Sequence, residues 1–408
     1  MKYAKYKETG ISWLPEVPDG WEIRRVKYLL DQVVEPSKSH CKVGLENIES
    51  KTGKFVESKA EFEGDGVAFK KGDLLYGKLR PYLAKVWMAT FEGNAVGDFI
   101  VLRPRVEFDS RFALYYMLSS SFTGICNAAT YGAKMPRVSP SFVSSLPLPV
   151  PTKEEQVRIS EYLDDKCSKV DSLVEAKTKQ IELFKELRQS IIAEAVTKGI
   201  DGCKTFKPTN IPWLPEVPET WEVAKVRQYF RLRSEKVSEK DYPALSVAKI
   251  GVVPQLSDVA ISMAEGDSRK LVREGDFVVN SRSDRKGSCG IAPRDGSVTT
   301  ISIVLEPRRI NHKYVHYLFR SVPWVEEFYR NGRGIVADLW TTRYQEMRNM
   351  LFPLPPLAEQ KRIVAYLDKK CAKIDALVAK IEDEVVKLKE YRERLVADVV
   401  TGQRKVVK

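Results

Sequence analysis

The amino-acid sequence predicts two mixed α/β (α+β) domains that are separated by a long antiparallel two-helix coiled coil and related by a pseudo-twofold internal repeat. Three observations lead to this fold class: a frame of motifs that occurs twice, a heptad pattern after each diverged segment, and two middle segments that differ. The chain has 408 residues, which is too long for one ordinary core, so a multidomain fold is expected.

The repeat consists of two blocks that recur in register. Trp-Leu-Pro-Glu-Val-Pro followed by Trp-Glu begins at Trp13 and again at Trp213, an offset of 200 residues. A second block of matched Glu-Gln, Arg-Ile, Tyr-Leu-Asp and Lys-Cys pairs begins at Glu155 and again at Glu359, an offset of 204. Between the blocks, the segments of about 30–145 and about 230–350 share only weak sequence similarity. The repeated blocks therefore predict one structural role that occurs twice, and the two diverged middle segments predict two different functions.

A long helix is predicted from about residue 152 to 198, with Thr152 as its N-cap and Gly199 as its stop signal. At 1.5 Å per residue, this helix and its counterpart in the second half each span about 65 to 70 Å. We expect the two helices to pack against each other in antiparallel orientation, whereas the alternative is that each helix only completes its own domain. The predicted seam positions are Leu163, Cys167, Val170, Val174, Ile181, Phe184, Ile191 and Ala195, then Leu367, Cys371, Ile374, Val378, Ile381, Val385, Leu388, Leu395 and Val399, with Lys177, Arg188 and Arg392 as interruptions.

The repeat order also predicts the segment limits and the place of the termini. We expect a first domain over 1–150, a first helix over 151–199, a second domain over 200–352 and a second helix over 353–408. The second helix ends at Thr401-Gly402, where the Trp-Leu-Pro block would have followed. A circular arrangement with pseudo-twofold symmetry would make the two termini neighbours in space.

Composition favours a polyanionic partner. The 67 Lys and Arg residues against 55 Asp and Glu give a net charge of +12. This positive charge favours nucleic acid over a membrane as the binding partner. No run of 18 apolar residues and no signal peptide occur, so we expect a soluble, cytoplasmic protein. His312 and His316 would share a helix face, but two ligands without a third partner fall short of a metal site. The cysteines, expected to be free thiols, are Cys41, Cys126, Cys167, Cys203, Cys289 and Cys371.

Basic, aromatic and amide side chains gather in loops of the two middles. Arg, Asn and Ser read base edges in the major groove, while Lys and Thr more often contact phosphates, so these loops suit direct readout of DNA. The alternative for each residue is a solvated surface charge. The candidate DNA-binding residues are Tyr76, Lys78, Arg80, Tyr82, Lys85, Tyr131, Lys134 and Arg137 in the first half, and Asn280, Arg282, Ser283, Arg285, Lys286, Asn331, Arg333, Thr341, Thr342 and Arg343 in the second.

One motif imitates a phosphate-binding loop. Residues 72–78 fit its first seven positions, but Leu79 follows where a hydroxyl would bind magnesium, and Arg80-Pro81 follows where a helix should begin. An ATP site is therefore not expected here. The sequence also lacks a dinucleotide loop, a methyltransferase motif and a nucleophile elbow.

The order of diverged domain, long helix, diverged domain, long helix resembles the specificity subunit of type I restriction-modification enzymes. The resemblance covers essentially the whole chain and rests on the Trp-Leu-Pro-Glu-Val-Pro and Glu-Gln…Tyr-Leu-Asp blocks in both halves; the Gly-Asp…Arg-Pro-Tyr stretch at 72–82 is weaker evidence. It implies two target recognition domains that bind double-stranded DNA, a helix pair that acts as a ruler, and no catalysis by this chain. It also implies two methyltransferase subunits and two restriction (translocase) subunits as partners, with S-adenosylmethionine, ATP and Mg²⁺ bound by those partners and not here.

Because the two middles differ, the target should be bipartite and asymmetric with an unread spacer. Two other function classes stay open at this point. One is a coiled-coil scaffold whose variable domains bind proteins. The other is a self-contained nuclease or methyltransferase, which the missing motifs disfavour.

Overall fold

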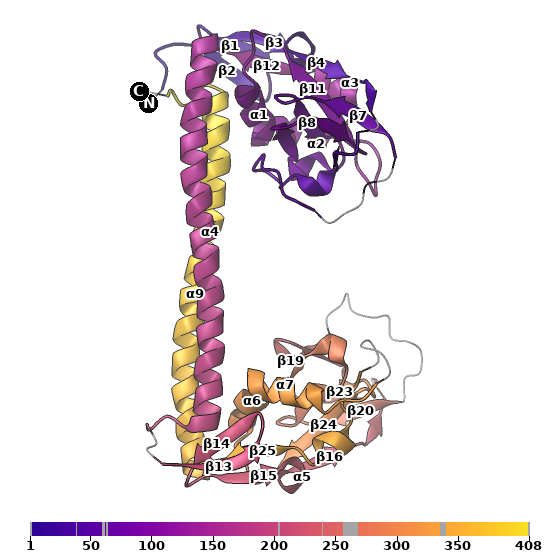
Figure 1. The fold of residues 1–408 in the computed structure, drawn as a ribbon, viewed down its shortest axis with the longest axis vertical. Helices are drawn as coiled ribbons and strands as arrows, with labels where there is room; N and C mark the ends of the chain where they lie inside the picture. The colour runs from indigo at the N-terminus through magenta and orange to yellow at the C-terminus, as the bar shows by residue number, and fades with distance from the viewer. Residues whose placement is uncertain are drawn as a thin grey trace. The chain divides into compact units, whose positions relative to one another are not determined.

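The computed structural model describes residues 2–37, 39–58, 62, 64–202, 205–238, 240–255, 268–334 and 340–406. The chain divides into two compact units, one made of residues 1–178 and 382–408 and the other of residues 179–381 (Figure 1). Each unit has its own hydrophobic core. Within the described part of the chain, no helix is both long and apolar enough to cross a membrane.

The first unit contains the first diverged segment, which folds as a mixed α/β domain, as predicted. Its two four-stranded sheets have the orders β4-β11-β8-β9 and β5-β7-β10-β6, and an aromatic and aliphatic cluster lies between them. The elements are β1 (Tyr6–Ile11), β2 (Leu14–Pro18), β3 (Glu22–Arg25), η1 (Val26–Tyr28), β4 (Leu30–Val33), β5 (Pro36–Ser37), β6 (Lys42–Val43), η2 (Leu45–Asn47), β7 (Gly66–Phe69), β8 (Leu74–Gly77), η3 (Pro81–Leu83), β9 (Val86–Met88), β10 (Gly93–Ala95), β11 (Phe99–Pro104), α1 (Ser110–Leu118), α2 (Ser120–Ala128), α3 (Pro140–Ser145) and β12 (Pro147–Val150).

The second unit repeats this plan with a reduced second sheet. Its main sheet has the order β16-β24-β21-β22, beside a three-stranded sheet β17-β20-β23 and a hairpin β18-β19. The elements are β13 (Phe206–Ile211), β14 (Leu214–Pro218), β15 (Glu222–Lys225), α5 (Val226–Tyr229), β16 (Phe230–Arg233), β17 (Lys236–Val237), β18 (Leu245–Ala248), β19 (Gly251–Pro254), β20 (Arg269–Val272), β21 (Phe277–Asn280), η4 (Ser283–Arg285), β22 (Cys289–Ile291), β23 (Gly296–Val298), β24 (Ser302–Pro307), α6 (His312–Phe319), α7 (Val322–Arg330), α8 (Tyr344–Met347) and β25 (Leu351–Leu354).

Two long helices, α4 (Lys153–Lys198) and α9 (Leu357–Val400), each contribute one half to each unit. In the first unit, Arg392 pairs with Asp171 and Lys177 with Glu384, so the numbering rises on one helix as it falls on the other. The second unit shows the same antiparallel order in the pairs Arg188–Asp375 and Arg362–Asp201. The predicted antiparallel packing is therefore confirmed within each unit, and the alternative that each helix completes only its own domain is wrong.

The predicted seam accounts for part of the buried side of both helices, which also includes Ile192, Val196 and Val396 outside the predicted positions. Leu163, Cys167, Leu395 and Val399 belong to the core of the first unit, and Ala195, Leu367 and Cys371 belong to that of the second. The seam interruptions Lys177, Arg188 and Arg392 each meet a carboxylate on the facing helix. The helix start is as predicted too, since the Thr152 hydroxyl accepts a hydrogen bond from the backbone N–H of Glu155 at 3.4 Å.

The repeated Glu-Gln pair has a structural role at the entry of each long helix. Gln156 accepts a hydrogen bond from the backbone N–H of Asp109 at 2.8 Å and donates one to the carbonyl of Pro151 at 2.9 Å. Gln360 makes the same two bonds, with the N–H of Asn311 at 2.9 Å and the carbonyl of Pro355 at 2.8 Å. Each glutamine thereby fixes the first turn of a long helix to the start of α1 or α6.

The two ends of the described chain meet in the first unit. The Tyr6 hydroxyl donates to the carbonyl of Gly402 at 2.9 Å, and the Gln403 side chain donates to the carbonyl of Glu16 at 3.4 Å. This confirms the predicted closeness of the terminal segments. Gly402 has a φ of +76° and lies against Pro18. In the second unit, Gly199 has a φ of +81° and lies against Trp221.

The cysteines at matching seam positions, Cys167 and Cys371, are buried, and burial raises the pKa of the Cys167 thiol to about 11. Five cysteines are free thiols in the described residues, as predicted, while Cys203 lies outside the described residues. Buried thiols of this kind act as small apolar side chains.

Candidate nucleic-acid interface

In the first unit, the structure joins the two loop segments that the sequence analysis selected. Leu79, which follows β8, forms an antiparallel bridge with Arg137, and Arg137 also bridges Tyr131. The backbone N–H of Arg80 donates to the carbonyl of Pro136 at 2.7 Å, and that of Val138 donates to the carbonyl of Lys78 at 3.0 Å. Residues about 60 positions apart therefore form one backbone platform, which we call the first loop pair (residues 76–85 and 131–137).

Four candidate side chains of the first loop pair are exposed. Tyr82 is 46% exposed and Tyr131 is 61% exposed, and Arg80 and Lys134 are also exposed. Arg80 has a φ of +50° although it is not glycine, and such left-handed conformations of ordinary residues are concentrated at functional sites. The backbone bond to Pro136 holds Arg80 in this conformation.

The other candidates of the first loop pair have partners within the protein. Lys85 donates to the carbonyl of Leu45 at 2.6 Å. Arg137 makes two hydrogen bonds to Asp98, at 3.0 and 2.9 Å, and these bonds raise the pKa of its guanidinium. Lys78 lies 3.8 Å from the same carboxylate. Arg137 and Asp98 therefore hold the loop in place, leaving less of the arginine for a ligand.

Tyr76 requires a correction. Its side chain is 1% exposed, packs edge-on against Phe122, and belongs to the core of the first unit. It lies on β8, whose four residues are all buried, so the side chain offers no surface to a ligand. We therefore leave Tyr76 out of the interface.

The second unit joins its two candidate segments in the same way. Arg282 bridges Thr341, and Thr341 also bridges Arg333. The backbone N–H of Ser283 donates to the carbonyl of Trp340 at 3.0 Å, and that of Thr342 donates to the carbonyl of Ser281 at 3.0 Å. We call residues 280–286 together with 331–334 and 340–343 the second loop pair; residues 335–339 lie outside the described residues.

Most exposed cations of the second loop pair have a carboxylate within reach. Arg282 and Arg285 flank Asp284 at 3.0 and 3.7 Å, Lys286 lies 2.6 Å from Glu326, and Arg333 lies 3.5 Å from Glu346. Arg333 is 85% exposed in spite of its pair. Such exposed pairs contribute little to stability, so a phosphate or base edge could exchange for the carboxylate at small cost.

The remaining candidates of the second loop pair differ in exposure and role. Arg343 is exposed at the start of α8. Asn331 donates to the backbone carbonyl and the carboxylate of Glu327, both at 2.9 Å, which closes the end of α7. Asn280 accepts a hydrogen bond from the N–H of Arg282 at 3.1 Å. Ser283 and Thr341 are partly exposed, whereas Thr342 is fully buried and donates to the carbonyl of Phe328, so Thr342 supports the loop.

The matching bridges align the two loop pairs residue by residue. Leu79 takes the place of Arg282, Tyr131 that of Arg333, and Arg137 that of Thr341. The backbone hydrogen bonds next to these bridges also match. The N–H of Gly77 donates to the carbonyl of Lys85 in the first unit, and the N–H of Asn280 donates to the carbonyl of Ser288 in the second. One backbone arrangement therefore presents two different sets of side chains.

The sequence reasoning missed the residues that support these loops. Asp98 holds Arg137 and Lys78, and the Ser281 hydroxyl donates to the carbonyl of Ile301 at 2.7 Å. Trp340 donates to the carbonyl of Tyr329 at 2.7 Å and lies over Gly332, where a Cβ atom would come within 2.3 Å of the indole nitrogen. Only the position of Asp98 directly before an apolar strand gave a signal in the sequence.

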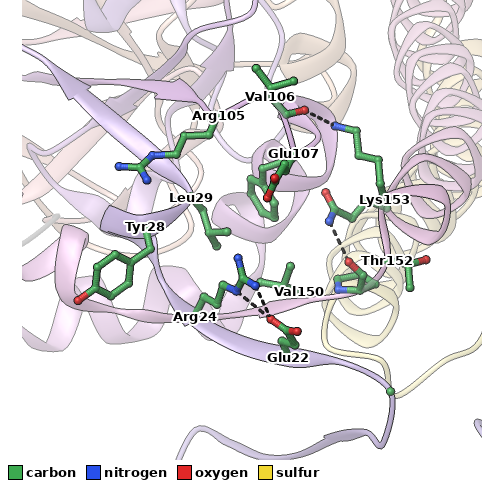
Figure 2. A pocket seen from close by; sticks show the side chains of 14 residues that line it. Glu22, Arg24, Tyr28, Leu29, Arg105, Val106, Glu107, Val150, Thr152 and Lys153 are labelled. Atoms are coloured by element: carbon green, nitrogen blue, oxygen red, sulfur yellow. Dashed lines mark hydrogen bonds and ion pairs between the residues drawn. The ribbon is translucent and has the colours of Figure 1, made fainter.

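A separate cavity of about 570 Å³ lies in the first unit and contains none of the candidate residues. Figure 2 shows its Arg24 paired with Glu22 and its Lys153 directed to the carbonyl of Val106. Its charges are of both signs and several are already paired, so its lining selects no ligand class. Among the described residues, no group of three or more His, Cys, Asp or Glu side chains could hold a metal ion. Leu74–Gly77 of the motif at 72–78 form strand β8.

Comparisons with known proteins give a consistent result. Residues 44–183 match the family model for the type I restriction modification DNA specificity domain. The chain is 22% identical to the type I restriction enzyme MjaVIII specificity subunit of Methanocaldococcus jannaschii, over 98% of this chain and 97% of that protein. It is 28% identical to the EcoDI specificity subunit of Escherichia coli, over 45% of this chain and 43% of that protein.

A solved structure supports the fold. A chain from work on complex assembly and conformational transition of the type I R-M system superposes with a TM-score of 0.73 at 19% identity, covering 94% of this chain and 98% of that chain. The repeated frame, the antiparallel helices and the two unlike α/β domains are thus a fold that this solved chain shares. In sequence the chain is therefore similar to type I restriction enzyme specificity subunits.

Proposed function

We propose that this chain reads a bipartite, asymmetric DNA target, with one half-site at each loop pair and an unread spacer between them. The alignment of the two loop pairs is the observation that supports this proposal. Their matching bridges provide the same backbone platform, while Leu79 against Arg282 and Tyr131 against Arg333 provide different surface chemistry. Two platforms with unlike side chains recognise two unlike sequences.

The exposed side chains divide by the kind of contact that they can make. Arg80 in the first unit and Arg282 in the second have the guanidinium geometry that binds guanine edges through two parallel hydrogen bonds. Tyr82 and Tyr131 offer exposed aromatic rings for apolar contact with base edges and sugars. Lys134, Lys286 and Arg343 suit phosphate contacts, which position the protein without reading sequence.

The paired helices serve as the ruler in this proposal. Both α4 and α9 run without interruption from residues of one unit to residues of the other. A continuous helix changes length only by 1.5 Å per residue, so the number of turns would set the spacer that the two half-sites tolerate. Removing one turn from both helices should shorten that spacer.

Catalysis in this proposal belongs to partner subunits. The chain would dock two methyltransferase subunits and, through them, two restriction subunits in the cytoplasm. S-adenosylmethionine, ATP and Mg²⁺ would bind to those partners. The role of this chain would be recognition and assembly only.

The test uses the full chain in complex with its methyltransferase partner and measures affinity for DNA in which one half-site at a time is altered. Arg80→Ala and Arg282→Ala should each weaken discrimination at a different half-site, by about 1 to 3 kcal/mol per lost pair of hydrogen bonds. Arg25→Ala, which removes an exposed arginine of β3 outside both loop pairs, is the charge-matched control. Loss at the same half-site in both arginine variants would contradict the assignment of two modules.

A salt titration separates this proposal from a protein-binding scaffold. Specific DNA binding should weaken steeply with salt, because each phosphate contact releases counterions. If the affinity for DNA in the presence of the methyltransferase did not change with salt concentration, the protein-binding scaffold would be favoured.

A further inference from the structure

A second cavity, of about 420 Å³, lies entirely within the second unit beside the second loop pair. Its lining combines Arg188 of α4, Lys249 of the β18-β19 turn, Lys286 of the second loop pair, and His316 and Arg320 of the α6 region, with Glu326 as the one carboxylate. We call it the cationic pocket. Elements from four parts of the unit thus bring basic side chains to one hollow.

The charges of the cationic pocket do not cancel. Lys286 pairs with Glu326 at 2.6 Å, and Arg188 pairs with Asp375 at 2.9 Å. For Lys249 and Arg320, no carboxylate partner lies within ion-pair distance among the described residues. The pocket therefore keeps two positive charges in excess of its acidic neighbours.

The matching place in the first unit is filled by protein. Arg392, the counterpart of Arg188, donates to the carbonyls of Lys51 and Thr52 at 2.9 and 3.3 Å while it pairs with Asp171. In the second unit, the turn carbonyls of Lys249 and Ile250 accept from Arg320 instead, at 2.5 and 3.4 Å. Among the described residues, Arg188 makes its hydrogen bonds to Asp375 through Nε and Nη2 and none through Nη1, and Arg188 is part of the pocket lining.

The local electrostatics indicate that the pocket is positive before any ligand enters. Burial lowers the pKa of Arg320; Cys289 opposes this shift, and the nearby charge of Arg188 adds to it. Burial also lowers the pKa of His316 to about 4, with Arg320 and Arg188 acting in the same direction and Asp368 against it. Donors in such surroundings interact strongly with an anion, because water screens them poorly.

We propose that the cationic pocket binds a phosphate group of the DNA backbone next to the half-site that the second loop pair reads. Lys286 belongs both to the pocket lining and to the second loop pair, and Gly287, the next residue, also lines the pocket. A DNA strand bound by the second loop pair would therefore pass the pocket opening. Arginine and lysine donors around one hollow match the several acceptor oxygens of a phosphate. This inference rests on the proposed DNA-reading function and adds a contact that positions the duplex without reading its sequence.

The test variant is Lys249→Gln in the full chain with its methyltransferase partner. The Lys249 side chain is exposed, and only its backbone carbonyl is used by the fold, so the substitution removes charge without removing a structural bond. Lys369→Gln, an exposed lysine of α9 outside the pocket lining, is the charge-matched control. Affinity for target DNA and for DNA with an altered second half-site is measured from low to high salt.

Lys249→Gln should weaken binding to both DNAs equally, by about eightfold at 0.1 M salt, and should reduce the slope of log affinity against log salt by about 0.9, as expected for one lost phosphate contact. Adding Arg188→Gln should lower the affinity for both DNAs and the salt slope further. A slope equal to that of Lys369→Gln would overturn the pocket assignment while leaving the Arg80 and Arg282 results, and thus the proposed function, intact.

The source of the phosphate is tested separately. Calorimetric titration of the DNA-free complex with inorganic phosphate, pyrophosphate and ATP should show no Lys249-dependent binding at micromolar concentration, because the proposed ligand is held by the duplex. Tight Lys249-dependent binding of a free nucleotide would overturn the assignment to DNA and identify the pocket as a nucleotide site.

Discussion

The two loop pairs show how one backbone arrangement carries two surfaces. In both units a residue just after a central strand bridges a residue from a loop about 60 positions further on, and that residue bridges a third. The first unit fixes its loop with the Arg137–Asp98 ion pair, whereas the second uses the hydroxyls of Ser281 and Thr342 on backbone carbonyls. The comparison teaches that backbone bridges, and not particular side chains, define the platform.

The two units also anchor equivalent turns differently. The turn at Lys51 and Thr52 is held by Arg392 of a long helix, and the turn at Lys249 and Ile250 by Arg320 beside α6. The first domain is thereby bound to its helix pair through a buried arginine, and the second leaves a hollow at the same place. Three predictions use these and other differences between the two units.

The largest effect is expected for Arg392→Ala. The arginine side chain is 8% exposed, and its removal leaves two carbonyls without their donor and Asp171 with Lys54 as its remaining ion-pair partner. Breaking such a buried pair should cost about 3 to 5 kcal/mol. Arg188→Ala should cost only about 0 to 1 kcal/mol, because its partner Asp375 is 57% exposed.

Urea denaturation of both variants, with hydrogen exchange followed over residues 49–54 and 246–252, measures this contrast. The first segment should lose protection in Arg392→Ala only. Equal losses of stability in the two variants would show that the two anchors are equivalent after all.

A smaller effect should separate the units by pH. His316 stands five residues after Asn311, the N-cap of α6, as Leu114 stands five residues after Asp109, the N-cap of α1. Burial holds the pKa of His316 at about 4, below the ordinary value of 6.5. Between these values the unfolded chain binds a proton that the folded chain does not, so the stability of the second unit should fall by about 1 to 3 kcal/mol as the pH falls from about 6.5 to about 4. His316→Leu should remove this part of the pH dependence.

The free energy of unfolding is measured for the native chain and for His316→Leu at pH 7 and pH 4.5. The titration of carboxylates affects both chains equally, so it cancels in the comparison. If the two chains lost the same stability on acidification, His316 would not be the source of the difference between the units.

The smallest effect is expected for Asp98→Asn. The carboxylate is 21% exposed and pairs with a partly exposed Arg137, so the loss of stability should stay under about 1 kcal/mol. The loop at 131–137 should nevertheless lose order, which would lower affinity for the first half-site and leave the second unchanged. Binding to DNA with each half-site altered in turn measures this, and equal loss at both half-sites would contradict it.

Much of this fold could be predicted because its signals are periodic or repeated. The blocks at Trp13 and Trp213 form matching hairpins, and the heptads at Leu163 and Leu367 lie in matching cores. Tyr76 shows the limit of such reasoning. It stands in a run of basic and aromatic residues, yet strand alternation and packing against α2 bury it, and neither is visible from residue type alone.

The sequence by itself determined the duplication, the antiparallel helix pair and the two segments of each middle that hold the exposed basic residues, because these follow from local periodicity and from self-similarity. Only the tertiary structure decided which of those residues face solvent, which arginine holds which turn, and where the cationic pocket opens. Those choices depend on contacts such as Leu79 with Arg137 and Arg320 with Lys249, which join positions far apart in the chain. Such contacts leave no periodic trace in one sequence.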